Sequence, residues 1–193
     1  MTYGTAMKDP GGYLHEEDIP KIIAAAGSER NQLLIKTLAA TGRRISEVVG
    51  EYGIRPSDID PVNSRIIFTI LKKRGKDKPR KWKLVPKYLA EQLAAFSANT
   101  PTAEPIFNMK RQYAFKIVRK AAEKAGVTTY SGKKVHPHHF RHTWVSKRIA
   151  EGVSFEEALR IRDYMEHSSI SITQGYSHLN TKKDSVLFKD EEL

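Results

Sequence analysis

The stretch Thr41-Gly42-Arg43-Arg44-Ile45-Ser46-Glu47 joins two predicted helices through a short turn. A glycine that follows an apolar helical pattern predicts a helix end, because glycine adopts backbone angles that other residues avoid. Arg44 begins the next predicted helix, so its guanidinium can project from the turn toward an anion. Arginine suits phosphate, since its planar fork donates two parallel hydrogen bonds and stays charged. Glu47, one turn later, either pairs with Arg44 and orients it or is an ordinary surface residue.

Two predicted helices precede this turn. From Glu16, apolar residues recur on one helical face until Gly27. Ser28 is a suitable cap for a second helix, which runs into Thr41-Gly42. A third, short helix is predicted from Ile45 to near Gly50. Residues 1–12, which are rich in glycine, are predicted to be a flexible lead or linker stub.

The pattern changes after Pro56. Residues 65–71 are β-branched and aromatic, as is typical of a strand, and residues 81–85 alternate as the returning strand. A short leading strand near 58–60 completes a three-stranded antiparallel sheet. Helices are then predicted at about 87–97, 110–125, 138–151 and 155–164, with a last helical stretch from Ser171 to Tyr176. The predicted fold class is mainly α, with this small sheet inserted between the third and fourth helices.

The turn between the two long strands is strongly basic. Its charged residues are Lys72, Lys73, Arg74, Lys76, Lys78, Arg80 and Lys81. A hairpin tip with this charge can contact a nucleic-acid backbone or enter a groove, whereas a merely solvated loop is the simpler alternative. A lysine at the strand end can also protonate a leaving oxygen as a general acid.

Four histidines and an arginine crowd the start of a later helix. His138 and Arg141 are three residues apart, which places them on one helical face, so that Arg141 and Arg44 can grip one phosphate from separate segments beside His138. A zinc site at His138 and His142 is disfavoured. The catalytic glutamate of a His-Glu-x-x-His helix is absent, and Arg141 would repel a cation. We therefore expect no metal and no cofactor.

The last two motifs are Glu166-His167-Ser168-Ser169 and Tyr176. A phenol can attack phosphorus, and the phenolate leaves a phosphotyrosyl ester more readily than an alkoxide would. This suits a reaction that must run backward to reseal. Tyrosine is also a common core residue, and the chain has 8 of them, so Tyr176 alone carries little weight.

Composition narrows the class of protein. The chain has 193 residues, enough for one sizeable domain, with 33 Lys+Arg against 22 Asp+Glu and a net charge of +11. Such a balance predicts a polyanionic partner or an anionic membrane surface. No apolar run approaches the roughly 18 residues of a spanning helix, so we expect no membrane partner. No cysteine is present, which excludes a disulfide framework and a thiolate metal site.

These motifs, in this order, closely resemble the catalytic domain of the tyrosine recombinases, the phage-integrase and Xer-like family. The family's Thr-Gly-x-Arg-x-Ser-Glu box matches residues 41–47, its His-x-x-Arg-His box matches 138–142, and its Gly-His-Ser-Ser-Ile box matches 166–170. The family's tyrosine lies nine residues after the histidine of that last box, at Tyr176. The resemblance implies a catalytic domain at 13–181 and carries catalytic roles onto Arg44, His138, Arg141, His167 and Tyr176.

The resemblance also implies the reaction. The arginines and histidines bind the scissile phosphate, Tyr176 forms a 3′-phosphotyrosyl link, and Lys72 or Lys73 protonates the 5′ oxygen, with Lys72 preferred from the spacing. Strands are then exchanged through a Holliday junction. The partners implied are a double-stranded DNA recombination site and a homo-tetramer, in which the tail at 182–193 packs in trans. The implied location is the cytoplasm of a prokaryotic cell, with the gene carried by that cell or by its virus or plasmid.

The sequence departs from the family pattern at two positions. Arg43 stands where the family usually has an apolar residue, and Glu166 where it usually has glycine; we expect Glu166 to point away from the phosphate. The N-terminal DNA-clamping domain of the family does not precede these motifs, so we expect either a trimmed fragment or a reduced natural form. The glycine-rich start favours the fragment. Two alternatives remain: a non-catalytic DNA-binding or excision helper on the same fold, and a type IB topoisomerase-like enzyme that relaxes DNA.

Overall fold

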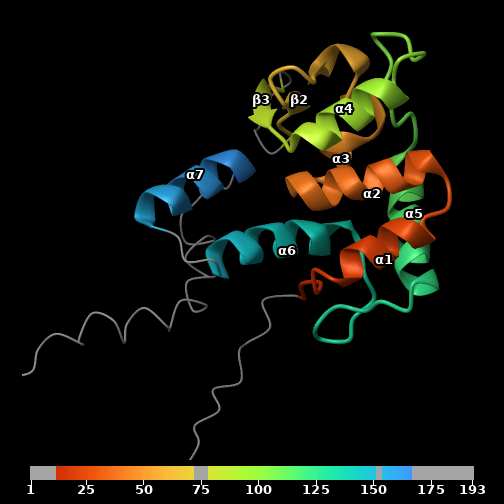
Figure 1. The fold of residues 1–193 in the computed structure, drawn as a ribbon, viewed down its shortest axis with the longest axis vertical. Coiled ribbons are helices and arrows are strands. Elements are labelled where there is room, and N and C mark those ends of the chain that lie inside the picture. Colours follow the sequence, from red (N-terminus) through yellow and green to blue (C-terminus); the bar gives the residue numbers. More distant parts are fainter. Residues whose placement is uncertain (1–11, 72–77, 151–153, 167–193) are drawn as a thin grey trace, which may run out of the picture.

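Seven α-helices and a small sheet make up the part of the chain that the computed structural model describes, residues 12–71, 78–150 and 154–166 (Figure 1). The helices are α1 (Asp18–Ala25), α2 (Glu29–Thr41), α3 (Ile45–Val48), α4 (Lys87–Phe96), α5 (Arg111–Lys124), α6 (Pro137–Ala150) and α7 (Phe155–Met165). The strands are β1 (Ile59–Asp60), β2 (Arg65–Thr69) and β3 (Arg80–Leu84). Two 3₁₀ turns, Gly50–Tyr52 and Pro56–Asp58, connect α3 to the sheet.

Helix α2 lies at the centre of the fold and packs against α1, α4 and α6. Its Leu34, Ile35 and Leu38 are fully buried. The helix begins as predicted, because the Ser28 side chain accepts a hydrogen bond from the backbone N–H of Asn31. This main core runs from Leu14 to Phe140 and joins six of the helices to one face of the sheet.

The sheet has the order β1-β2-β3, and both pairings are antiparallel. Ile66 and Phe68 of β2 are fully buried, whereas Trp82 of β3 is 44% exposed. Ile66 and Phe68 are two residues apart on β2, and because successive side chains of a strand point to opposite faces, both point to the same buried face. One face of the sheet is therefore held on the helical core, and β3 is left at the edge of the sheet.

Helix α7 is held by a second, smaller cluster. Trp144 and Val145 of α6 pack there with Ile161 and Met165 of α7. The Trp144 and Tyr164 rings stack with their centroids 4.9 Å apart. This cluster sets the end of α7 beside the C-terminal end of α2, where the two approach in Figure 1.

The predicted fold class is confirmed, and so is the place of the sheet between the third and fourth helices. Helix and strand bounds differ from the predicted ones by a few residues at most, and the 3₁₀ turns were not predicted. The predicted helical stretch from Ser171 to Tyr176 lies outside the described residues.

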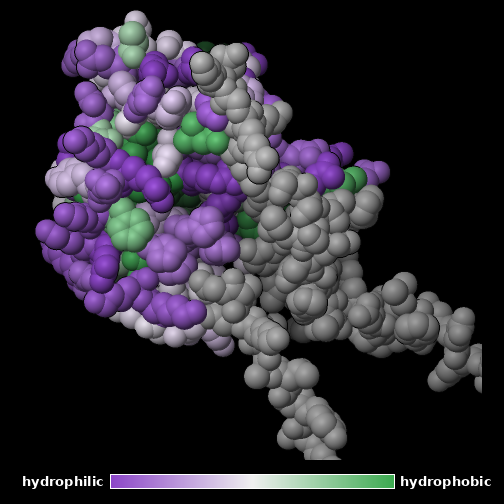
Figure 2. Space-filling view, turned by 180° about the vertical axis from the view of Figure 1, so that it is seen from behind, coloured by the Kyte–Doolittle hydropathy of each residue, from purple (hydrophilic) through white to green (hydrophobic). Residues whose placement is uncertain are grey.

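One face of the described residues is mainly polar (Figure 2). Figure 2 shows one face of the molecule, on which hydrophilic residues predominate and hydrophobic residues form small separate patches. In the described segments, no helix combines the length and the apolar character that crossing a bilayer requires.

Candidate active site

The turn after α2 places Arg44 at the start of α3. Gly42 ends α2 in the left-handed conformation, with φ of 60°. A Cβ atom at this position would lie 3.0 Å from atoms of Trp144 and of Met165. Glycine is therefore required here for two reasons: its backbone angle and the close approach of α6 and α7.

Glu47 holds Arg44 from one turn away. The Arg44 Nη1 atom lies 3.0 Å from Glu47 Oε1, and the Arg44 backbone N–H donates to Glu47 Oε2. The Glu47 side chain is fully buried, whereas that of Arg44 is 26% exposed. The alternative of a surface Glu47 is therefore wrong, and Arg44 keeps a solvent-facing part while its orientation is fixed.

Arg141 is buried, with 4% of its surface exposed. Its Nη1 donates to the carbonyl oxygen of Gly42 at 2.9 Å, and its Nη2 donates to that of Met165 at 2.6 Å. The guanidinium thus joins the end of α2 to the end of α7 and places a positive charge two residues from Arg44. The two predicted phosphate-binding arginines are brought together at one turn.

A cavity of about 470 Å³ lies at this turn, between α3, α5 and α6. Arg44 and His138 both line it, as do Ser46 and Arg111. Arg111 is exposed at the first position of α5 and was not among the residues predicted for the site. The only signal in the sequence is a Lys110-Arg111 pair before a helix, which is common on any surface.

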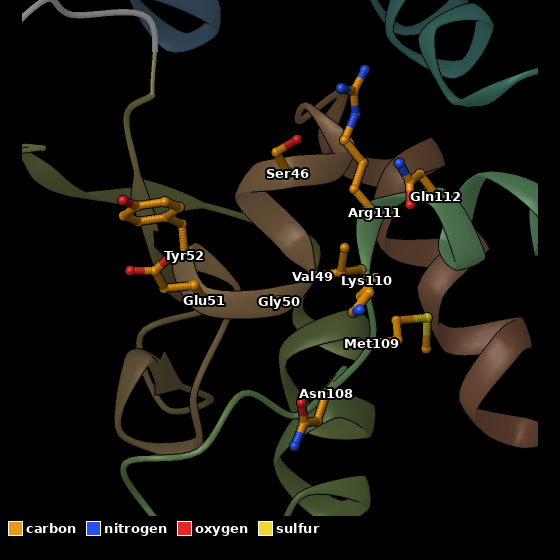
Figure 3. A pocket seen from close by; sticks show the side chains of 10 residues that line it. All are labelled: Ser46, Val49, Gly50, Glu51, Tyr52, Asn108, Met109, Lys110, Arg111 and Gln112. Carbon is orange, nitrogen blue, oxygen red and sulfur yellow. The ribbon is translucent and has the colours of Figure 1, made fainter.

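A neighbouring pocket of about 640 Å³ shares Ser46 and Arg111 with this cavity (Figure 3). Figure 3 shows Ser46 on α3 and Arg111 on α5 at the same end of the pocket, and Asn108 at the other. Because Arg111 lines both, the polar surface beside Arg44 continues past the first cavity.

The four clustered histidines form two ring pairs. His136 and His139 stack with their centroids 3.6 Å apart, and His138 and His142 meet edge to face at 4.6 Å. Although His138 is exposed, partial burial of its ring lowers its pKa to about 4, and its interactions with His142, Arg141, His136 and Arg44 contribute. His138 is therefore neutral at pH 7 in the free protein. Within the described segments, no three His, Asp or Glu side chains are grouped so as to hold a metal ion.

His139 gives the fold a dependence on pH. The residue is 2% exposed, and its Nδ1 accepts a hydrogen bond from the backbone N–H of His136. Burial, together with His136, His142, His138 and Lys133, lowers the pKa of His139 to about 4. The unfolded chain then binds more protons than the folded one between that value and the ordinary histidine pKa of about 6.5.

We therefore expect stability to fall as the pH drops from about 6.5 to about 4. The loss from His139 should approach about 3 kcal/mol, since each pH unit between the two pKa values is worth about 1.4 kcal/mol. Urea unfolding at pH 7 and at pH 4.5, for the wild type and for His139→Gln, measures it. An equal loss in both proteins would contradict the role of His139.

Part of the basic hairpin is tied to carboxylates. Arg80 pairs with the buried Asp58, and Lys81 lies 3.0 Å from Glu166. Lys78 also lies within the described residues. The other predicted DNA-binding residues of the hairpin, Arg74 and Lys76, lie outside them, and so do the catalytic candidates Lys72, Lys73, His167 and Tyr176.

Glu166 ends α7 with φ of 53°, the left-handed conformation that glycine usually provides. Its Oε1 lies 3.0 Å from the Nζ atoms of both Lys81 and Lys83 on β3. Partial burial opposes ionisation, but the hydrogen bonds from these lysines outweigh it and lower the pKa of Glu166. The carboxylate is therefore directed to β3, where two lysines compensate its charge.

The sequence profile of the phage integrase family matches residues 12–183. The tyrosine recombinase XerD of Bifidobacterium longum is 26% identical over 171 residues, which cover 78% of this chain and 50% of that protein. The chain thus spans about half the length of this curated relative.

Solved structures share the fold. The XerA recombinase superposes with a TM-score of 0.68 at 23% identity, covering 94% of this chain and 65% of that one. The XerH site-specific recombinase bound to its difH substrate, in a post-cleavage complex, superposes with a TM-score of 0.66 at 16% identity, covering 92% of this chain and 53% of that one.

The fold is thus that of tyrosine recombinases, and the site has the arginine and histidine residues of their first two sequence boxes. The match over residues 12–183 shows that the chain belongs to the phage integrase family.

Proposed function

We propose that this chain is the catalytic part of a site-specific DNA recombinase that cuts and rejoins strands through Tyr176. The convergence of Arg44, His138 and Arg141 carries the proposal. Arg44 and His138 line one cavity, and Arg141 donates to the Gly42 carbonyl beside it. Two segments far apart in the sequence thus come together at one turn, which supports a shared anion site.

The chemistry follows from these groups. The Tyr176 phenol releases its proton to water and its oxygen attacks the scissile phosphorus. The bond to the 5′ oxygen breaks, and Lys72 or Lys73 gives that oxygen a proton. Arg44, Arg141, His138 and His167 bind the phosphate oxygens, whose charge is most concentrated in the transition state. The 3′-phosphotyrosyl bond keeps the free energy of the phosphodiester, so a 5′ hydroxyl from another strand can reverse the step and rejoin DNA.

The partner that we propose is double-stranded DNA carrying a recombination site. A net charge of +11 supports it, because basic proteins bind DNA largely through its phosphates. XerH, which has the same fold, is bound to its difH substrate in its solved structure.

We also propose the organisation that the family resemblance implies. Residues 13–181 would form the catalytic domain, and 182–193 would pack into a neighbouring protomer of a tetramer on a Holliday junction. A separate N-terminal domain would clamp the DNA in the full-length protein. Bacterial relatives such as XerD support the cytoplasm of a prokaryotic cell as the site of action.

The experiment that tests the function selects the target site from random DNA. The protein is incubated with a pool of duplexes of randomised sequence, each nicked so that the cleaved end diffuses away and rejoining fails. Covalently bound DNA is recovered after denaturation and sequenced, and the attached peptide is identified by mass spectrometry. We expect enrichment of one sequence class on the peptide that holds Tyr176. An adduct on another residue would contradict the mechanism, and adducts without sequence preference would favour a topoisomerase.

A further inference from the structure

Arg43, the residue next to the proposed catalytic Arg44, is buried in the protein. Its side chain has no exposed surface, although it reaches the wall of the cavity that Arg44 and His138 line. The guanidinium lies over the Phe68 ring of β2 and the Tyr164 ring of α7, with its carbon 5.4 and 4.7 Å from the ring centroids. Its Nη2 donates to the carbonyl oxygen of Tyr164.

This position is costly for a cation. Burial lowers the pKa of Arg43, and within the described residues its Nε and Nη1 atoms have no hydrogen-bond partner. Aromatic faces and one carbonyl compensate only part of the lost hydration. A well-packed apolar side chain is often at least as stable as a buried ion pair at such a place. The arginine therefore has to be explained by something besides stability.

The neighbour that gives Arg43 a role is Glu47. Its Oε1 lies 3.0 Å from Arg44 Nη1, while its Oε2 lies 3.9 Å from Arg43 Nη1. One buried carboxylate thus lies between two arginines, and the three side chains together carry a charge of +1. Without Arg43, Glu47 would neutralise Arg44 completely, and the cavity would lose one unit of positive charge.

We propose that Arg43 is a positioning residue that divides the charge of Glu47 and thereby keeps Arg44 positive toward the scissile phosphate. This inference rests on the proposed strand cleavage. When a phosphate binds Arg44, Glu47 can shift its hydrogen bond toward the Nη1 atom of Arg43, so the carboxylate orients Arg44 without competing with the substrate. Arg43 also fixes the end of α7 through the Tyr164 carbonyl.

The test compares cleavage with binding. The variants are Arg43→Met, which keeps the length but not the charge, Glu47→Gln, and the double variant. Cleavage of the nicked substrate is measured in single turnover, and DNA affinity by fluorescence anisotropy. We expect Arg43→Met to bind DNA within about threefold of the wild type and to cleave about 100-fold more slowly, the loss typical of a misplaced catalytic group.

The double variant distinguishes charge from packing. Arg43→Met with Glu47→Gln restores the charge of +1, so it should cleave at least about tenfold faster than Arg43→Met alone. A residue that only filled space would show no such rescue. Arg30→Met, the same change at the opposite end of α2, should cleave as the wild type does.

Two outcomes would overturn the inference: an Arg43→Met protein that cleaves at the wild-type rate, or a double variant no faster than Arg43→Met. If Arg43→Met does not fold, Arg43→Lys replaces it in the same cycle with Glu47→Gln. Lysine keeps the charge, so the Arg43→Lys protein should cleave within about tenfold of the wild-type rate. A loss of cleavage rate of about 100-fold would contradict the charge argument. A wild type that forms no adduct contradicts the proposed function instead, and so the two failures are distinct.

Discussion

A protein with Tyr176→Phe should bind DNA as tightly as the wild type and form no covalent adduct with it. Phenylalanine keeps the ring but lacks the oxygen that attacks phosphorus, so no phosphotyrosyl bond can form. The phosphate-binding arginines are unchanged, and with them the charge that determines affinity. The measurement is denaturing electrophoresis of labelled, nicked DNA, with anisotropy for binding.

The matched control for this variant is Tyr130→Phe. Tyr130 is 62% exposed, and its ring stacks on that of Tyr13, away from the cavity beside Arg44. Tyr130→Phe removes one hydroxyl group and should leave adduct formation unchanged. An adduct that persists in Tyr176→Phe would mean that another residue is the nucleophile.

Replacing Arg141 by alanine should weaken the fold and the reaction together. The Gly42 and Met165 carbonyls would lose their charged donor inside the protein, and hydrogen bonds to charged groups contribute about 1.5–3 kcal/mol each. We expect the free energy of unfolding to fall by about 3 kcal/mol. Cleavage should fall by at least about 100-fold, because a preorganised positive donor at the phosphate is removed.

Lys147→Ala on the same helix is the control for Arg141→Ala. Lys147 is an exposed residue that pairs with Glu16, and the change should alter stability by less than about 0.5 kcal/mol. Urea unfolding followed by circular dichroism gives the stabilities. An Arg141→Ala protein as stable as the wild type would show that the two carbonyls find other donors.

Local signals were sufficient to predict most of the fold. Ser28 caps α2 and Gly42 ends it, and both effects depend on residues within one turn of the helix. The β-branched and aromatic residues of the strands are likewise a local signal, and they predict the strands. The contact between Arg44 and Glu47 is also local, at a spacing of three residues, and it matches one of the two alternatives that the spacing allowed.

Contacts between distant segments were not predictable in this way. Arg43 and Arg44 are identical side chains in adjacent positions, yet one is buried and the other partly exposed. What separates them is the packing of Tyr164, which is 121 residues away from Arg43. Likewise, the sequence predicts that Arg141 is cationic but not that its donors would meet two backbone carbonyls.

Gly42 has a consequence for the dimensions of the active site. Trp144 and Met165 would each lie 3.0 Å from a Cβ atom placed there, so α6 and α7 approach α2 as closely as a bare backbone allows. Arg141 reaches the Gly42 carbonyl across that gap. A single added methyl group would push the helices apart and lengthen the span between the two arginines. The spacing of the three helices beside the proposed anion site is therefore set by a residue that has no side chain.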